Sequence, residues 1–175
     1  MAYARKYTPK EVHDLLKACE GNNNGGNPNS AHTYGQHLNI SMQGLTTRVV
    51  SEVKEAATKF ASEEDLVGAA YEALNSGAGF AELQKLDSKT EKRVLIKHTL
   101  VGKYEADVQY GDVWTMPFAL DGVPSKQKNV AKKANTFSGA IGGTSGTRAL
   151  KVVLIVDSAG SPDVPWIQTC YPVVD

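Results

Sequence analysis

The sequence predicts an α+β fold in which N-terminal helices pack on a twisted antiparallel sheet. Amphipathic helix patterns fill the first half of the chain, whereas alternating and continuous apolar runs typical of strands fill the second half. Helices followed by antiparallel strands favour the α+β class. The length of 175 residues suffices for one domain with a substantial core and is short for two.

Three helices are predicted from capping residues that precede an apolar face. Thr8, Pro9 and Glu11 form a capping box with proline at the first helical position, and this helix continues to about Glu20. A serine can cap each of the other two helices, over residues 41–53 and 62–77. Acidic residues in the first turn of the last helix suit the helix dipole.

An Asn/Gly-rich stretch over residues 21–30 separates the first helix from the rest of the chain. It contains no apolar residue, which predicts a flexible loop. We therefore expect an N-terminal helix and linker over residues 1–30, and the functional domain over residues 31–175.

The second half of the chain predicts a series of strands. Residues 93–100, 103–110 and 113–118 are consecutive candidates, followed by a connection over 121–148 that is rich in Gly, Ser, Thr and Lys. Residues 151–156 are apolar enough for a central strand. After a turn, residues 166–173 form the last predicted strand.

Composition excludes some classes of protein. A net charge of zero argues against a strongly basic protein that coats nucleic acids, but an enzyme can hold a few phosphates by its local field. No apolar run approaches the roughly 18 residues of a membrane span. The first six residues lack the apolar core of a signal peptide, so we expect nothing in the chain itself to direct export.

Four histidines are the first candidates for acid–base chemistry, because imidazole titrates near neutrality. His13 lies between polar neighbours and His98 lies inside a strand pattern, so a surface and a structural role are expected for them. His32 and His37 differ, because they share a short polar segment with a glycine, just before a helix. Two such histidines taken alone are more often ordinary loop residues.

Neither a metal site nor a cofactor is expected. The spacing of His32 and His37 could suit zinc, but the chain offers no cysteine pair and no HExxH helix to complete the ligand set. The glycine-rich residues 139–147 lack the end of a phosphate-binding P-loop. Cys19 and Cys170 are expected as two buried thiols, with a disulfide as the alternative.

Several other residues allow both a structural and a functional interpretation. Arg48 can lay its stem on the core, which the sequence alone favours, or hold a phosphate with its fork of donors. Thr169 and Tyr171 are ordinary strand residues that share one face, where their hydroxyls could orient a phosphate or a base. A basic group inside the long connection is either a solvated face or a contact for RNA phosphates or a protein partner: Lys126, Lys128, Lys132 and Lys133.

The order of these pieces resembles the bacterial RNase A-like toxin domain, found at the C-termini of contact-dependent growth-inhibition and other polymorphic toxins. The resemblance covers about residues 30–173. It rests on His32-Thr33, on His37-Leu38, on the helix that carries Leu45 and Arg48, on the segment Ala56–Ser62, and on the closing Thr169-Cys170-Tyr171-Pro172. This chain departs from the family's pattern before His32, after His37 and in its long insertion.

The resemblance implies a kidney-shaped, RNase A-like fold with a central cleft. On the matched positions, His37, Arg48, Thr169 and Tyr171 are the catalytic residues and His32 is a flanking candidate. The implied activity is a metal-independent ribonuclease that needs no cofactor and leaves 2′,3′-cyclic phosphate and 5′-hydroxyl ends. Whether His32 or His37 is the main acid or base stays open.

The resemblance also implies a biological setting. The protein would be a monomeric toxin domain, secreted or delivered from the cell surface as part of a larger effector, that cuts RNA such as tRNA in the cytoplasm of a target cell. A cognate immunity protein would neutralise it. The alternatives are a non-catalytic protein-interaction module and a toxin of another enzymatic class, such as a nucleotide-modifying domain.

Overall fold

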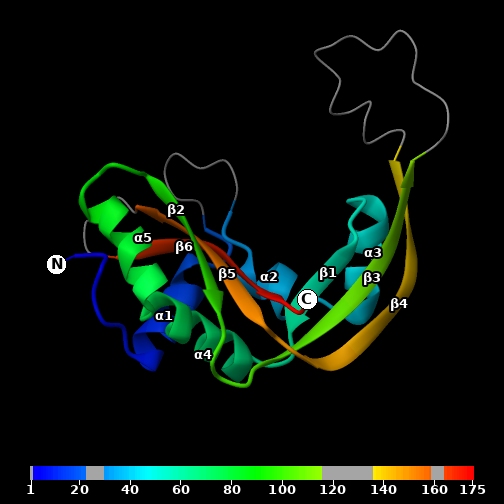
Figure 1. The fold of residues 1–175 in the computed structure, drawn as a ribbon, viewed down its shortest axis with the longest axis horizontal. Coiled ribbons are helices and arrows are strands. Elements are labelled where there is room, and N and C mark those ends of the chain that lie inside the picture. The colour runs from blue at the N-terminus through cyan, green and yellow to red at the C-terminus, as the bar shows by residue number, and fades with distance from the viewer. Residues whose placement is uncertain (1, 23–29, 116–135, 159–163) are drawn as a thin grey trace, which may run out of the picture. The chain divides into compact units, whose positions relative to one another are not determined.

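The computed structural model describes residues 2–22, 30–115, 136–158 and 164–175. Within these ranges the chain forms helices and antiparallel sheets, and the α+β prediction is confirmed (Figure 1). The helices are α1 (Pro9–Cys19), α2 (Thr33–His37), α3 (Met42–Ser51), α4 (Glu63–Leu74) and α5 (Gly77–Asp87). The strands are β1 (Ala56–Phe60), β2 (Arg93–Thr99), β3 (Glu105–Thr115), β4 (Thr136–Arg148), β5 (Lys151–Ser158) and β6 (Pro165–Val173).

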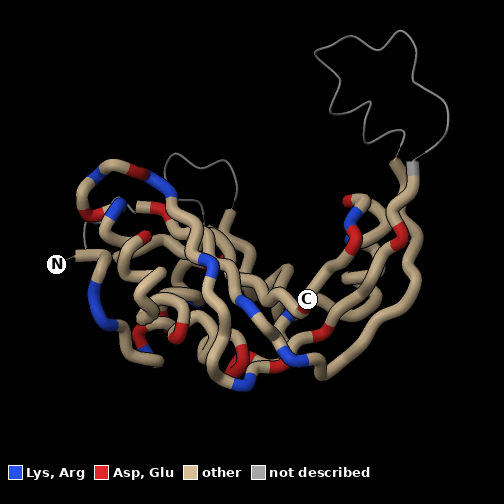
Figure 2. The backbone as a smooth tube through the Cα atoms, in the orientation of Figure 1, with Lys and Arg blue, Asp and Glu red and all other residues tan. Residues whose placement is uncertain are grey.

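The contacts divide the chain into two compact units. The first comprises residues 1–40, 58–106 and 146–175, and the second comprises residues 41–57 and 107–145. Acidic and basic residues are interspersed along the described chain, in keeping with its net charge of zero (Figure 2). None of the described helices is long and apolar enough to cross a membrane.

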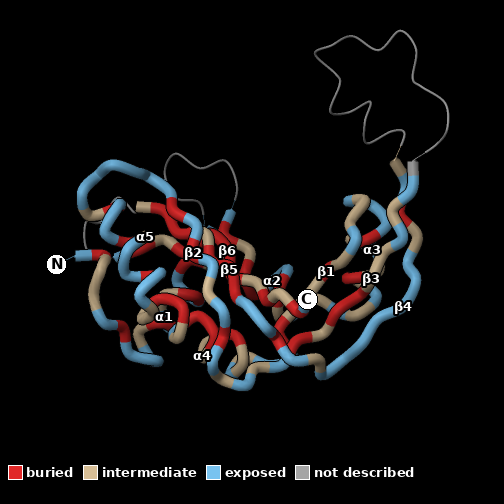
Figure 3. Tube along the Cα trace, viewed as in Figure 1, coloured by how far each residue is buried: buried red, intermediate tan, exposed pale blue. Residues whose placement is uncertain are grey.

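The first unit is built on a sheet with the strand order β2-β5-β6. Both pairs are antiparallel: Arg93 pairs with Asp157 at one end of β2, and Lys151 pairs with Val173 across β5 and β6. The prediction that residues 151–156 form a central strand is confirmed, because Val152, Val153, Leu154 and Val156 are buried. Figure 3 shows the buried residues concentrated along these strands and on the helices of the unit.

The predicted helix starts are confirmed by their caps. Thr8 accepts from the backbone N–H of Glu11, whose side chain accepts from the N–H of Thr8, so the capping box is complete. The side chains of Ser41 and Ser62 accept from the N–H groups of Gly44 and Asp65 and so cap α3 and α4. The apolar residues Val12, Leu16 and Cys19 of α1 are buried. The capping box fixes the start of α1, and the buried apolar face fixes the helix in the unit.

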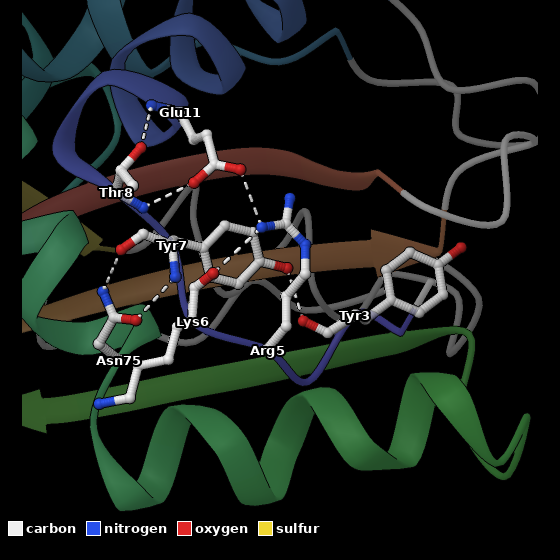
Figure 4. A network of polar contacts seen from close by, with 7 residues as sticks. All are labelled: Tyr3, Arg5, Lys6, Tyr7, Thr8, Glu11 and Asn75. Atoms are coloured by element: carbon white, nitrogen blue, oxygen red, sulfur yellow. Dashed lines mark hydrogen bonds and ion pairs between the residues drawn. The ribbon is translucent and has the colours of Figure 1, made fainter.

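The segment before α1 is tied to the helices α4 and α5, and Figure 4 shows its contacts with Asn75, the residue that follows α4. Asn75 accepts from the N–H of Tyr7 at 2.9 Å and donates to its carbonyl at 3.0 Å, while Asp87 accepts from the N–H groups of Tyr3 and Ala4. Burial raises the pKa of Tyr7 to about 12. Residues 2–22 therefore pack as part of the first unit. The prediction that the functional domain begins at residue 31 is not tested by this packing and stays a prediction.

The two cysteines are free and buried, as expected. Burial raises the pKa of both thiols, most strongly that of Cys170, which keeps them protonated near neutral pH.

The second unit packs α3 and the residues after it on parts of β3 and β4. Leu45 and Val49 are buried, and the N–H of Gly111 donates to the carbonyl of Glu55 at 2.9 Å. A Cβ atom at Gly111 would lie 2.2 Å from the carbonyl oxygen of Lys54 and 2.4 Å from Val49. Only glycine at position 111 permits this close approach of β3 to Val49 and Lys54.

Two sequence predictions of elements were wrong. Residues 103–110 and 113–118 were expected as two strands, but β3 runs unbroken from Glu105 to Thr115, because Gly111 serves close packing and not a turn. The described end of the expected connection over 121–148 is the strand β4, which pairs with β3. The predicted end of the third helix at Asn75-Ser76-Gly77 is confirmed, because α4 ends at Leu74 with Asn75 as its C-cap, but the helix α5 that Ser76 caps was not predicted.

One half-buried carboxylate supports a stability prediction. Glu72 of α4 accepts from the N–H groups of Val101 and Gly102 at 2.5 and 2.9 Å, and contacts Nε2 of His98 at 2.8 Å. Burial by itself would raise the pKa of Glu72, but these hydrogen bonds outweigh it and lower the pKa below its usual value of 4.5. The ionised carboxylate therefore stabilises the turn after β2.

We expect Glu72→Gln to lower the free energy of unfolding at pH 7 by about 2 kcal/mol, since hydrogen bonds to a charged group are lost. Because the folded pKa is depressed, the contribution is complete above about pH 4.5 and fades as the pH falls through the folded pKa. Urea unfolding at pH 7 and at pH 3.5 measures this. The matched control is Glu64→Gln, an exposed position of the same helix. Equal losses in the two variants, or a difference that does not shrink in acid, would contradict the role of Glu72.

Candidate functional site

The segment that carries His32 and His37 lies against the last strand of the chain. The N–H of His32 donates to the carbonyl of Gln168 at 3.2 Å, and the N–H of Cys170 donates to Oγ1 of Thr33 at 3.0 Å. The side chain of Gln168 adds a third bond, to the carbonyl of Ser30 at 2.9 Å. These bonds hold α2 beside β6 within the first unit.

His37 is the last residue of α2, and its side chain is buried, with 7% of the residue exposed. Its Nδ1 lies 3.3 Å from the carbonyl oxygen of Thr58. The hydroxyl of Thr58 donates to the carbonyl of Pro172 at 2.7 Å, so the residue that holds the imidazole is itself tied to β6. The ring centroid of His37 lies 5.4 Å from that of Tyr171.

His32 stands at the N-cap of α2 and is half-buried. Its ring centroid lies 5.9 Å from that of His37, and its Nδ1 lies 3.1 Å from the carbonyl oxygen of Ser30. A carbonyl oxygen only accepts, so the Nδ1 atom of each ring carries the proton in these contacts. In the neutral rings Nε2 is then the basic nitrogen of both histidines. The two imidazoles thus share one tautomer, with the proton on Nδ1.

Thr169 and Tyr171 contribute hydroxyls from β6. The spacing of two residues places their side chains on one face of the strand. Only 4% of Thr169 is exposed, and its buried Oγ1 has no hydrogen-bond partner among the described residues. Tyr171 is half-buried, and burial raises the pKa of its phenol, which therefore keeps its proton at neutral pH. A buried hydroxyl without a partner is unfavourable unless a ligand satisfies it.

Arg48 belongs to the second unit, where it lies on α3. Its side chain is 15% exposed, and its Nε and Nη2 atoms lie 3.0 and 3.4 Å from the two carboxylate oxygens of Glu52. Burial would raise the pKa of Glu52, but the hydrogen bonds from Arg48 and Lys54 outweigh it and lower the pKa to about 2. The guanidinium thus holds a carboxylate by its fork, the geometry that also suits a phosphate.

The structure therefore brings together His32, His37 and Tyr171, with Thr169 on the same strand. Arg48 lies in the other unit, and its share in the site stays a proposal. Lys126, Lys128, Lys132 and Lys133 lie outside the described residues.

The other two histidines have carboxylate partners. Nε2 of His13 lies 2.9 Å from Glu63, and Nε2 of His98 lies 2.8 Å from Glu72. His98 is thus bonded within the fold, as expected of a structural histidine. His13 is half-buried rather than solvated. In the part of the chain that the structure describes, no three His, Cys, Asp or Glu side chains form a group that could hold a metal ion.

Sequence reasoning missed two supporting residues of the site. Thr58 contributes a backbone carbonyl, which leaves no signal in a sequence because every residue has one. Glu20, at the end of α1, accepts from the N–H groups of Tyr34 and Gly35 at the start of α2. A carboxylate before a predicted flexible loop reads as an ordinary helix end, and its partner amides lie 14 and 15 residues further along the chain.

Comparison with known proteins gives a partial likeness. No model of a protein family matches the sequence, and no curated protein matches it. The structure is similar to a chain of the crystal structure of a CdiA-CT/CdiI complex from Y. kristensenii, with a TM-score of 0.45 and 14% sequence identity. The similarity covers 78% of this chain and 94% of the other. Because so few residues are identical, the chemistry proposed below rests on the contacts within this chain.

Proposed function

We propose that this protein is a metal-independent endoribonuclease. The observation that most supports the proposal is the pair of imidazoles, each with Nδ1 against a main-chain carbonyl and with ring centroids 5.9 Å apart. Both rings then offer Nε2 for proton transfer, one as a base and the other, once protonated, as an acid. RNA carries its own nucleophile, the 2′-hydroxyl, so two correctly placed proton carriers suffice for cleavage.

In the proposed reaction a base removes the proton of the 2′-hydroxyl, and the 2′-oxygen forms a bond to the adjacent phosphorus. The bond from phosphorus to the 5′-oxygen breaks, and an acid gives a proton to that oxygen. The products are a 2′,3′-cyclic phosphate and a 5′-hydroxyl. His37 takes one of these roles, and His32 or Tyr171 takes the other.

Thr169 and Arg48 are two further residues proposed to act on the RNA. The buried hydroxyl of Thr169 can satisfy its hydrogen-bonding capacity on a phosphate or a base edge. Arg48 would stabilise the charge that develops on the phosphorus oxygens, as fixed donors do in a dry site. The four lysines between β3 and β4 are proposed as further phosphate contacts.

Single-stranded RNA, including tRNA loops, is the proposed substrate, because unpaired bases and phosphodiesters can be splayed into a site. The wider setting follows from the resemblance of the sequence to RNase A-like toxin domains. We infer a toxin used in competition between bacteria, delivered to a target cell and neutralised in the producer by an immunity protein.

Cleavage of total RNA tests the proposed function. We expect fragments with 2′,3′-cyclic phosphate and 5′-hydroxyl ends, undiminished cleavage in EDTA, and intact DNA, because DNA has no 2′-hydroxyl. The ends are identified by mass spectrometry of a cleaved oligonucleotide. Cleavage of DNA, loss of activity in EDTA, or 5′-phosphate ends would rule out this mechanism. Absence of any cleavage would favour a non-catalytic binding module.

The histidines are tested by single substitutions. We expect His37→Ala to lower kcat/KM by about 10²- to 10⁴-fold, the usual contribution of a general acid or base. His32→Ala measures the share of the second imidazole. His13→Ala is the matched control, since His13 bonds Glu63 outside the cluster, and it should keep nearly full activity. A His37→Ala protein that is folded and fully active would refute the site.

The unpartnered hydroxyl of Thr169 separates function from stability. Thr169→Val replaces the hydroxyl with a methyl group of similar size, so we expect the free energy of unfolding to stay equal or rise by about 1 kcal/mol. Cleavage should nevertheless fall at least about tenfold if the hydroxyl binds substrate. Urea unfolding and initial rates on the same preparation measure the two effects. A destabilised Thr169→Val protein would show that the hydroxyl stabilises the fold. A variant that cleaves RNA at the normal rate would show that the hydroxyl does not act on the substrate.

A further inference from the structure

Glu20 joins the end of α1 to the start of the helix that carries the two histidines. Its Oε2 accepts from the N–H of Tyr34 at 2.9 Å, and its Oε1 accepts from the N–H of Gly35 at 2.8 Å. The main chain on either side adds a short bridge, in which the N–H of Gly21 donates to Ala31 and the N–H of Ala31 donates to Asn22. Each carboxylate oxygen thus holds one amide of α2.

The helix α2 needs such a partner. It has only five residues, and a helix of this length is not stable by itself. His32, its N-cap residue, makes no capping hydrogen bond with its side chain. The first amides of a helix have no partner within the helix, and a cap normally satisfies the second or third of them. Glu20 satisfies both from outside, with a negative charge at the end of the helix where the dipole favours one.

The bonds of Glu20 act on the site through both imidazoles. His32 is the N-cap of α2 and His37 is its last residue, so the course of this one turn of helix sets the distance between the two rings. The bonds to Gln168 and Cys170 hold the segment on β6, whereas Glu20 holds it from α1. Val12, Leu16 and Cys19 are buried and hold α1 in the unit, so the helix that carries Glu20 at its end is itself fixed.

We propose that Glu20 is a positioning residue of the active site, whose carboxylate fixes α2 so that His32 and His37 face the substrate together. This inference rests on the proposed ribonuclease function for its kinetic test. Its structural test, in contrast, concerns the place of the imidazoles and needs no activity.

The test compares Glu20→Gln with Glu11→Gln. Glutamine at position 20 keeps the size of the side chain but offers one acceptor oxygen and an NH₂ group that cannot accept, so one amide of α2 loses its partner. Glu11→Gln removes the same kind of carboxylate cap from the start of α1, away from the histidines. Both variants should lose a similar amount of thermal stability. A difference in kcat between them therefore reports the position of α2 and not a general loss of stability.

We expect kcat on a short single-stranded RNA to fall by about 10²-fold in Glu20→Gln, as misplacement of catalytic groups does, with KM changed less than about threefold. Glu11→Gln should leave both constants near those of the unaltered protein. In ¹H–¹⁵N spectra the amide signals of Tyr34 and Gly35 and the imidazole nitrogens of His37 should move in Glu20→Gln alone.

A kcat within about twofold of the unaltered protein, or an equal loss in Glu11→Gln, would overturn the proposal. Unmoved imidazole signals of His37 in Glu20→Gln would overturn it as well. If the unaltered protein does not cleave RNA, the proposed function fails, and the spectra alone decide on Glu20. Movement of the His37 signals in that variant alone then still supports the positioning role.

Discussion

The hydrogen bonds between residues 30–33 and residues 168–170 are the constraint on which the candidate site depends. They join two segments from opposite ends of the sequence, one with two histidines and the other with a threonine and a tyrosine. Neither segment has a site by itself. A five-residue helix cannot hold its own shape, and a strand presents its hydroxyls only to what lies against it. The pairing turns four ordinary side chains into one cluster.

Main-chain groups then set the chemistry of that cluster. The carbonyls of Ser30 and Thr58 accept from Nδ1 of His32 and His37, and a carbonyl imposes one tautomer on each ring. Thr58 is in turn bonded to Pro172, so the orientation of the His37 ring is tied to the same strand that carries Tyr171. The burial of Cys170, between Thr169 and Tyr171, fixes the strand in the core. The tautomers of the two imidazoles thus depend on backbone geometry as much as on residue type.

Much of the fold could be predicted from the sequence, and the reasons are local. Thr8, Ser41 and Ser62 mark helix starts because their side chains bond amides three residues ahead, and the apolar run in β5 indicates a central strand. The missed elements depend on distant partners. The predicted break at residues 111–112 is absent because Gly111 packs closely against Val49 and Lys54, and residues 136–148, predicted as part of a connection, pair with β3. The same division holds for the site: side chains with chemistry are visible in the sequence, whereas Glu20 and the carbonyl of Thr58 are not.

The most direct test of the account is the imidazole ¹⁵N spectrum of His37 during titration with a short RNA whose attacking 2′-hydroxyl is replaced by hydrogen. This RNA can bind but cannot be cleaved. We predict that the free protein shows the tautomer with the proton on Nδ1, and that the RNA shifts the Nε2 signal in a saturable way while Nδ1 stays bonded to Thr58. A proton on Nε2 in the free protein, or an Nε2 signal that does not respond at saturating RNA, would contradict the claim that this nitrogen faces the phosphodiester.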